Sequence, residues 1–279
     1  MDNRNVAPVV KYFIYLLMLL FSIMAIYPIL WLVAQSFKTT QEYVTTSKLA
    51  LPKVWYFANY SYTWQMGKFG TLFINSVFYT FITVAVVVVL ALMEGFAFAK
   101  FKFRITPLLH GLFIMGILLT LQSIMVPLFL MVNAVKLYNT RLGVLIPYIG
   151  LGLPMGVYLA TEFVKSIPGE LIESARIDGA GYLRIFARII FPMCSPVAVI
   201  LAILTFTGTW NEFMLINVLT SHDSIKSLPV GIARFSGALG SDYGKQFAGL
   251  VIGLVPILIF YGIFRNQITK GVAAGAVKG

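Results

Sequence analysis

Between Pro168 and Pro192 the chain reads PGELIESARIDGAGYLRIFARIIFP, and this stretch lies between two long apolar runs. Charged residues make up 11% of the whole chain. Six of them fall within this short stretch: Glu170, Glu173, Arg176, Asp178, Arg184 and Arg188. Lipid cannot solvate such a density of charge, so the segment must lie outside the hydrocarbon of a membrane. The sequence here predicts an integral membrane protein with a structured loop at one surface.

The composition agrees with a protein that is solvated mainly by lipid. Its 279 residues are 59% hydrophobic and the mean hydropathy is +0.88, whereas soluble domains average about 45–50% apolar residues. Six apolar runs are long enough to cross about 30 Å of hydrocarbon as helices that rise about 1.5 Å per residue. They cover residues 12–36, 70–99, 107–132, 142–164, 189–218 and 246–264. We therefore expect an all-α integral membrane fold with six transmembrane helices, a single domain over residues 1–279 and a surface loop over residues 165–190.

Lys and Arg residues near the ends of the runs indicate the orientation, because they are in excess on the cytoplasmic side. With the N-terminus inside, 12 of them fall on inner segments and 9 on outer segments. The cluster FAKFKFRI at residues 98–105 strengthens this assignment, so both termini are predicted to be cytoplasmic. We therefore attribute the formal charge of +11 to the orientation of the spans and to contact with anionic lipid headgroups, and not to binding of nucleic acid.

The charged loop has the signals of two short helices and a sharp turn. Pro168 suits the first turn of a helix, and Gly179 can end that helix because glycine adopts positive φ readily. Arg184 and Arg188 are four residues apart on the second helix, which leads to Pro192. From these residues alone, the loop is either an interfacial hairpin that connects two spans or a docking element for a soluble partner.

Several residues of the loop resemble a known motif. Glu173-Ser174-Ala175, then Gly179, Ile189 and Pro192, keep the spacing of the EAA loop (E-A-A, three residues, G, nine residues, I-x-L-P) of permease subunits of ATP-binding-cassette importers. Ser174 replaces Ala and Phe191 replaces Leu. The run ELIESARIDGA is similar to the carbohydrate-importer branch, the maltose-type inner-membrane permeases. Three further stretches of this chain also resemble that branch: Asn75-Ser76, Trp210-Asn211-Glu212-Phe213 and the ending Gly275-Ala-Val-Lys-Gly279.

The resemblance implies a type I importer permease fold in a bacterial inner membrane, with the loop as a coupling helix that docks on an ATPase. It implies this coupling role for Glu173, Ala175, Asp178 and Gly179, and places Lys278 close to the ATPase dimer. The implied partners are a second permease subunit, two ATPase subunits that bind ATP and Mg, and an external solute-binding protein. The chain would form half of the translocation pathway, with alternating access, and would bind no cofactor of its own.

No catalytic or metal site is predicted. The phosphate-binding pattern G-x-x-x-x-G-K-[ST] is absent from the sequence, so the chain is not expected to bind nucleotide. The two histidines, His110 and His222, are far apart in sequence and do not form a metal-ligand cluster. We therefore expect a transport subunit and not an enzyme.

Polar groups within the spans are candidates for the substrate pathway, because they are expensive in lipid. The candidates are Asn75, Gln122, Trp210, Asn211 and Glu212. The alternative is that Asn and Gln side chains tie neighbouring helices together. Glu94, near the inner end of the second run, would either reach toward water or pair with a cation; proton transfer is the less favoured role.

Two other functions stay open at this point. An ion-coupled secondary transporter would show buried carboxylates near the bilayer midplane and internal repeats, and an importer of the same type could carry a non-sugar solute such as a glycerol phosphate. A membrane-embedded enzyme is disfavoured by the lack of a nucleophile–base or metal constellation. The sequence does not identify the sugar.

Overall fold

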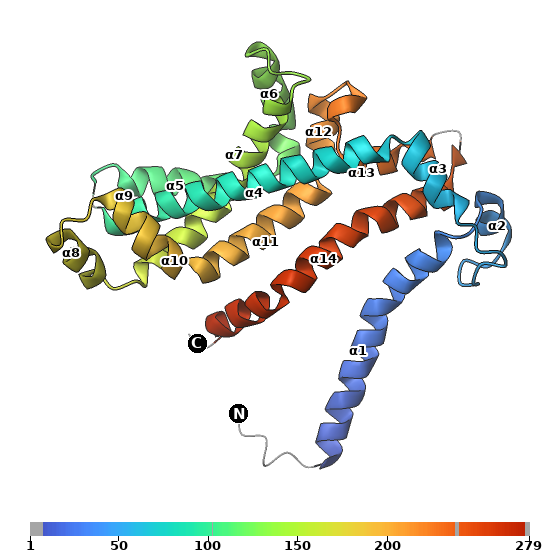
Figure 1. The fold of residues 1–279 in the computed structure, drawn as a ribbon, viewed down its shortest axis with the longest axis horizontal. Coiled ribbons are helices and arrows are strands. Elements are labelled where there is room, and N and C mark those ends of the chain that lie inside the picture. The colour runs from blue at the N-terminus through green and yellow to red at the C-terminus, as the bar shows by residue number, and fades with distance from the viewer. Residues whose placement is uncertain (1–7, 102, 238–239, 277–279) are drawn as a thin grey trace. The chain divides into compact units, whose positions relative to one another are not determined.

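The structure is a computed structural model that describes residues 8–101, 103–237 and 240–276. Helices form nearly all of it (Figure 1). The longer helices are α1 (Pro8–Gln35), α4 (Phe69–Lys100), α5 (Thr106–Ile117), α6 (Leu121–Ala134), α7 (Arg141–Lys165), α11 (Ser195–Asn211) and α14 (Tyr243–Ala276). The shorter elements are α2 (Thr40–Thr45), α3 (Ala58–Met66), α8 (Glu170–Ile177), α9 (Tyr182–Ile185), the π-helical η1 (Phe186–Ile190), α10 (Phe191–Met193), α12 (Met214–Leu219), the 3-10 helix η2 (Asp223–Ile225), α13 (Leu228–Ala233), β1 (Ser236–Gly237) and β2 (Gly240–Ser241). The all-α fold class is confirmed.

The described part of the chain forms two compact units. The first combines the chain up to Phe69 with Gly231–Val255, and the second combines Gly70–Val230 with the chain from Pro256 onward.

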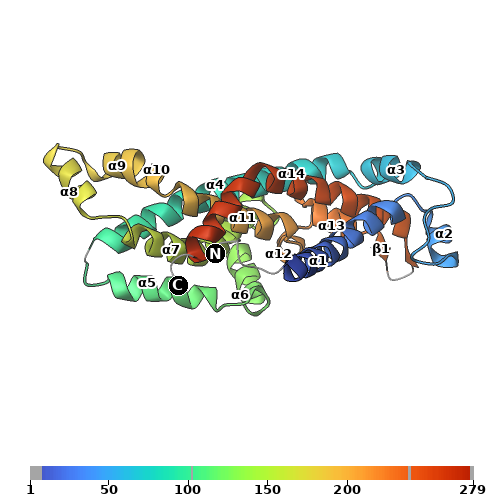
Figure 2. The same ribbon diagram turned by 90° about the horizontal axis from the view of Figure 1, so that it is seen from below.

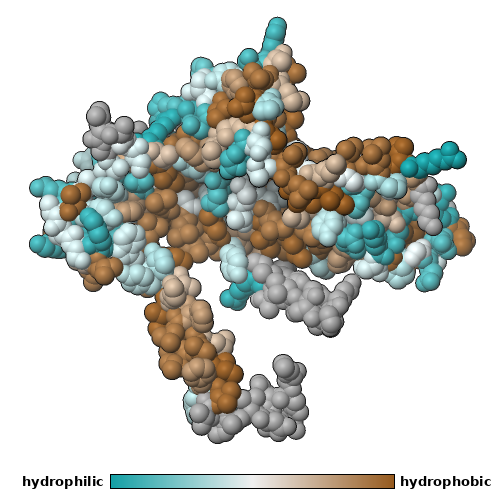
Figure 3. Space-filling view, turned by 180° about the vertical axis from the view of Figure 1, so that it is seen from behind, coloured by the Kyte–Doolittle hydropathy of each residue, from teal (hydrophilic) through white to brown (hydrophobic). Residues whose placement is uncertain are grey.

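Four of the six predicted spans correspond to single long apolar helices, which cover Val10–Gln35, Phe69–Lys100, Arg141–Lys165 and Tyr243–Arg265. Their exposed surfaces are rich in hydrophobic side chains (Figure 3), as lipid-facing helices require. The third predicted span is instead a pair of helices, α5 and α6, bent by 110°. The break falls where Thr120 takes an extended conformation before α6.

The fifth predicted span differs in a similar way. The segment Tyr182–Met193 meets α11 at an angle of 77°, close to Pro192 and Pro196, which lack the N–H that a continuous helix needs. At its other end α11 stops at Asn211, and Glu212 is extended. The run of residues 189–218 therefore contains two chain breaks that its apolar composition concealed.

Helices α4 and α7 approach very closely in the second unit, and glycines make this possible. A Cβ atom added to Gly152 would lie 2.9 Å from Val87, and one added to Gly156 would lie 2.9 Å from Ala91. Gly95 of α4 faces Ala160 of α7 in the same way. Small residues allow close packing of helices within a membrane, where apolar burial alone gives no driving force. This packing explains Gly152 and Gly156 in the fourth predicted span.

Two buried apolar clusters form the core of the second unit. One joins α4, α7 and α11 with the charged loop, and its members include Leu92, Val164, Ile185, Ile190 and Leu201. The other joins α4, α6, α7 and α12, and its members include Tyr79, Val132, Tyr148, Leu215 and Val230. The first cluster thus connects the interior of the helices directly to the loop that carries α8.

The first unit holds α1, the segment with α2 and α3, and the start of α14. Asn59 is buried and its Nδ2 donates hydrogen bonds to the carbonyl oxygens of Ser36 and Lys38, both at 2.8 Å. The rings of Trp31 and Phe247 pack edge to face with centroids 5.6 Å apart. Amide and aromatic contacts therefore join segments that are distant in sequence.

Asp242 gives this unit a dependence on pH. Its carboxylate accepts a hydrogen bond from Thr40 Oγ1 at 2.8 Å and pairs with Lys245 Nζ at 2.6 Å. Burial acts to raise the pKa of Asp242, but the hydrogen bonds from Lys245 and Thr40 and the charge of Lys245 outweigh it and hold that pKa below its ordinary value. A lowered pKa in the folded state stabilises the unit above the unfolded value of about 3.9, and the stabilisation is lost as pH falls through the folded pKa.

We expect the wild-type protein to lose thermal stability below about pH 4 partly through Asp242. The Asp242→Asn variant should be less stable near neutral pH and should lack this component of the acid dependence. Melting temperatures measured from pH 3 to pH 7 in detergent check the prediction. Glu162→Gln is the control, because the Glu162–Lys165 pair is about half exposed and such pairs contribute little. Equal acid profiles for Asp242→Asn and wild type would contradict it.

Candidate functional site

The charged loop is a helix followed by a tight turn and a second helical segment. Helix α8 begins at Glu170, two residues after Pro168, and has Glu170 and Glu173 in its first turn. Carboxylates at this end interact favourably with the helix dipole. Figures 1 and 2 show α8 and α9 together at one end of the second unit. The predicted helical hairpin is therefore present, with a slightly later start.

Gly179 ends α8 as predicted. Its φ is +77°, a value that residues with a Cβ adopt at a cost of about 1–2 kcal/mol. The amide of Ala180 donates to the carbonyl of Ala175 at 2.9 Å, and the amide of Gly179 donates to that of Arg176 at 3.0 Å. These two bonds form a Schellman motif, which satisfies the last carbonyls of the helix.

The two faces of α8 have different surroundings. Ile172 and Ala175 pack against the apolar cluster that contains Ile185 and Val164. On the opposite side Ile177 is 87% exposed, and Glu173 and Asp178 are exposed with it. An isolated apolar side chain amid charges on a protruding helix is suited to contact with another protein surface.

Side-chain contacts fix the loop to the ends of the long helices. Lys100 Nζ at the end of α4 donates to the carbonyl of Ile167, and the ring of Phe101 packs against that of Tyr182 with centroids 4.8 Å apart. The guanidinium of Arg176 lies over the Tyr182 ring at 4.5 Å. Displacement of α8 would therefore be transmitted to α4 and to the segment that enters α11.

The second segment is not a simple helix. After α9, residues Phe186–Ile190 form a π-helical turn and α10 follows. Arg184 and Arg188, which we placed on one helical face, are both exposed. Arg184 lies in α9 and Arg188 in the π-helical turn.

Asn75 connects α4 to the segment between α12 and α13 of the same unit. It is 1% exposed, its Nδ2 donates to the carbonyls of Ser224 at 2.8 Å and Lys226 at 3.0 Å, and its Oδ1 accepts from Arg141 Nη2 at 3.1 Å. The adjacent Ser76 Oγ accepts from the amide of Leu228 at 2.8 Å. This geometry matches the structural alternative for Asn75, a polar tie between chain segments.

Glu212 stands at the break between α11 and α12. Its Oε2 accepts from Tyr148 Oη at 2.7 Å and from the amide of Ile216 at 3.1 Å, and its Oε1 accepts from the amide of Leu215 at 2.6 Å. The carboxylate thus satisfies the first amides of α12 and joins α7 to α11. Sequence reasoning did not single out Tyr148, because no local pattern marks a tyrosine whose partner is 64 residues away.

The other predicted site residues lie in different places. Trp210 is buried and stacks on Phe206 with centroids 5.7 Å apart. Asn211 is exposed and its Nδ2 bonds to the carbonyl of Thr207 in its own helix. Gln122 is exposed at the start of α6. Lys278 lies outside the described residues.

Glu94 is half-buried in α4, and its Oε2 has no hydrogen-bond partner within the described ranges. Among the residues that the structure describes, no group of three or more His, Cys, Asp or Glu side chains could hold a metal ion.

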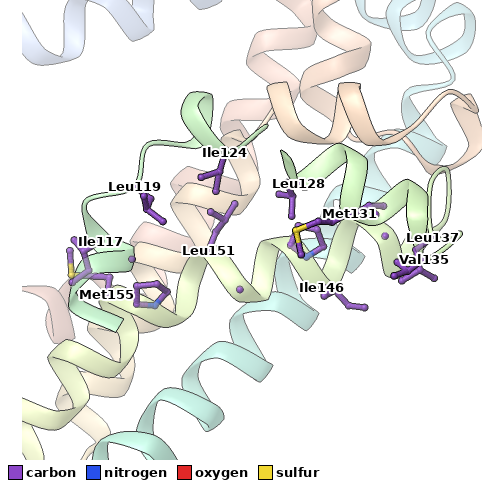
Figure 4. A pocket seen from close by; sticks show the side chains of 16 residues that line it. Ile117, Leu119, Ile124, Leu128, Met131, Val135, Leu137, Ile146, Leu151 and Met155 are labelled. Carbon is purple, nitrogen blue, oxygen red and sulfur yellow. The ribbon is translucent and has the colours of Figure 1, made fainter. Parts of the chain in front are cut away.

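Two cavities lie beside α7. The larger, about 590 Å³, is formed by α5, α6 and α7, and the side chains labelled in Figure 4 are aliphatic or methionine. The smaller, about 430 Å³, lies mainly between α7 and α11 and is lined by Leu119, Leu121, Tyr148, Leu151, Gly152, Met155, Gly156, Leu201, Leu204, Thr205, Gly208, Thr209 and Glu212. Of the candidate pathway residues, the second cavity includes Glu212.

The fold and sequence are similar to those of known transport proteins. One relative, a putative ABC transporter permease protein (ORF2) of Caldicellulosiruptor sp., is 37% identical over 268 residues, which are 96% of each chain. The diacetylchitobiose uptake system permease protein NgcG of Streptomyces coelicolor is 33% identical over 264 residues, 94% of this chain and 87% of the relative. A crystal structure of a bacterial ABC transporter involved in the import of the acidic polysaccharide alginate has a chain with a TM-score of 0.80 at 22% identity, over 95% of this chain and 98% of the other.

A family model also matches most of the chain. The family is described as the inner membrane component of binding-protein-dependent transport systems, and its model matches residues 91–270, which include the whole charged loop. This match favours the ATP-driven importer over the ion-coupled transporter that the residues alone had left open. The chain belongs to the family of binding-protein-dependent transport system inner membrane components and is a permease subunit of an ABC importer.

Proposed function

We propose that this chain is the membrane subunit of an ATP-driven importer of sugars or oligosaccharides and forms half of its translocation pathway. The relatives support the substrate class, since NgcG is named for uptake of diacetylchitobiose. The six apolar segments are too few to enclose a sugar-sized path alone, so a second permease subunit would complete it. An external solute-binding protein would deliver the sugar.

In this proposal two ATPase subunits dock on the cytoplasmic side and bind ATP and Mg. Both termini of the chain then lie in the cytoplasm of a bacterial cell, on the same side of the inner membrane as α8. Lys278 would approach the ATPase dimer.

The exposed face of α8 is the observation that carries the coupling role. Ile177, Glu173 and Asp178 face solvent, whereas Ala175 is packed on the core. The ATPase would contact the exposed side, and the buried side would pass the motion to α4 and α11. A short helix with a rigid end at Gly179 can turn ATPase closure into rigid-body movement of the spans, provided that the two pore states differ in their contacts with it.

The test is a Glu173→Lys/Gly179→Val variant of the assembled transporter. We expect ATP hydrolysis stimulated by the substrate-loaded binding protein to fall to the basal rate, because the first change reverses a docking charge and the second strains the turn. Gly181→Ala is the matched control: Gly181 has a negative φ of −73° and open space around a Cβ, so it should retain stimulation. Normal stimulation in the double variant would disprove the coupling role.

A further inference from the structure

The smaller cavity, between α7 and α11 within the second unit, has the form of a binding site. Its volume of about 430 Å³ lies within the range of about 300–1,000 Å³ that is usual for small-molecule sites. Gly208 on α11 lines the cavity without a side chain. A Cβ atom added to Gly208 would meet nothing within 4 Å, so this wall is open.

The polar groups of the cavity suit a ligand with many hydroxyl groups. Tyr148, Thr205 and Thr209 contribute hydroxyls, and Glu212 contributes a carboxylate, while the remaining lining residues are aliphatic, methionine or glycine. The Glu212 carboxylate receives three hydrogen bonds from the protein, and a carboxylate offers about four acceptor positions. A position is therefore left for a donor from a ligand, and the apolar walls can cover the C–H faces of a sugar ring.

The charge of the cavity limits which sugars fit. Glu212 is the only charged residue among the described residues that line it. An acidic sugar would bring a second negative charge beside this carboxylate in a site of low dielectric, with no lining cation to compensate. An uncharged sugar meets no such repulsion.

We propose that the cavity between α7 and α11 receives one ring of an uncharged sugar during transport, with Glu212, Thr205 and Thr209 as its polar contacts. The proposal rests on the proposed import of carbohydrates and adds to it a site and a charge preference. It separates this chain from the permease of the alginate transporter of similar fold, whose named substrate is acidic. The neighbouring apolar cavity of about 590 Å³ has no polar side chain among its described lining residues and provides a comparison.

The test uses thiol modification in the assembled transporter. Cys194 is the only cysteine and is buried, so Cys194→Ala provides a background for Gly208→Cys. Gly150→Cys is the matched control, because Gly150 lines the apolar cavity and also has open space around a Cβ. Each variant is treated with a trimethylammonium or a sulfonate methanethiosulfonate reagent, which differ in charge and react with water-accessible thiols.

We expect Gly208→Cys to react with both reagents. Because an anionic thiolate itself favours a cationic reagent, the rates are compared as the ratio of cationic to anionic reagent, and this ratio should be about tenfold higher at Gly208→Cys than at Gly150→Cys because of the nearby carboxylate. Adding Glu212→Gln should remove this preference, and the same change should leave the ratio at Gly150→Cys unaltered. Should Glu212→Gln not fold, the preference at Gly208→Cys compared with that at Gly150→Cys still tests the charge. No reaction at Gly208→Cys, or a reagent ratio equal to that at Gly150→Cys, would overturn the proposal.

Protection by sugars tests the ligand itself. A mixture of uncharged di- and trisaccharides should slow modification of Gly208→Cys, and an equal concentration of di- and trimeric uronates should not. Protection by neither mixture, or by the uronates, would reject the sugar site. Binding-protein-stimulated ATP hydrolysis is measured in the same preparations: if it persists, the importer function stands although the site is wrong.

Discussion

Replacing Gly95 by leucine is expected to prevent accumulation of the folded protein. A Cβ atom at this position would lie 2.7 Å from the Cβ of Ala160, 2.8 Å from its carbonyl carbon and 2.9 Å from the amide nitrogen of Thr161. Two of these three atoms are backbone atoms of α7, so no side-chain rotation can relieve the clash. Overpacking in a core costs about 1–3 kcal/mol and sometimes more, and here α4 and α7 would have to separate along their contact.

The measurement for Gly95→Leu is the yield of monodisperse protein in detergent and its melting temperature. Gly111→Leu on α5 is the control, since a Cβ there meets nothing within 4 Å. It should leave yield and melting temperature nearly unchanged. A Gly95→Leu protein with wild-type yield and stability would show that α4 and α7 do not pack as described.

Asn75→Leu is the second change with a large expected effect. Leucine has a similar size but would leave the carbonyls of Ser224 and Lys226 and the guanidinium of Arg141 without the amide that now bonds them. Each buried polar group left unpaired costs about 1–3 kcal/mol, so we expect a clear drop in the melting temperature. The segment from Leu219 to Leu228 should also exchange its amide hydrogens faster, because its attachment to α4 is weakened.

Asn211→Leu is the matched control for Asn75→Leu. Asn211 is exposed, and its amide bonds to a carbonyl of its own helix, so its loss should have a small effect. Hydrogen exchange followed by mass spectrometry measures the exchange rate of the amides from Leu219 to Leu228 separately from the stability of the whole protein. Unchanged exchange there in the Asn75→Leu protein would show that Asn75 does not hold it.

Asn75 and Glu212 show that the sequence identifies the polar residues of the spans but does not tell which of them have a structural role and which line a pathway. Both are costly in lipid, and for both a role in the substrate pathway or in structure was possible. The amide of Asn75 bonds to Ser224 and Lys226, which lie about 150 residues further along the chain. Glu212 is bonded to Tyr148 and also lines a cavity. These partners depend on long-range contacts that a local pattern does not record.

The apolar composition of the third and fifth runs also did not predict that each run is broken into two helices. The segments on both sides of Thr120 and of Cys194 are largely apolar, and hydropathy measures how well lipid solvates a segment, not the direction in which the chain runs. The bends of 110° and 77° depend on how each half packs. The fourth run illustrates the converse: glycines interrupt its apolar pattern, but Gly152 and Gly156 are positions where α4 approaches α7.

The primary structure alone was sufficient for the membrane class, the approximate helices and the hairpin between Pro168 and Pro192, because these follow from solvation of each segment and from local backbone preference. Gly179 is the clearest case, since positive φ is a property of a single residue and its turn. The three-dimensional arrangement was needed to show which face of α8 is free, what holds Asn75 and where Glu212 meets Tyr148. Those features arise from contacts between segments that are distant in sequence, and such contacts form and contribute free energy only when the helices pack together.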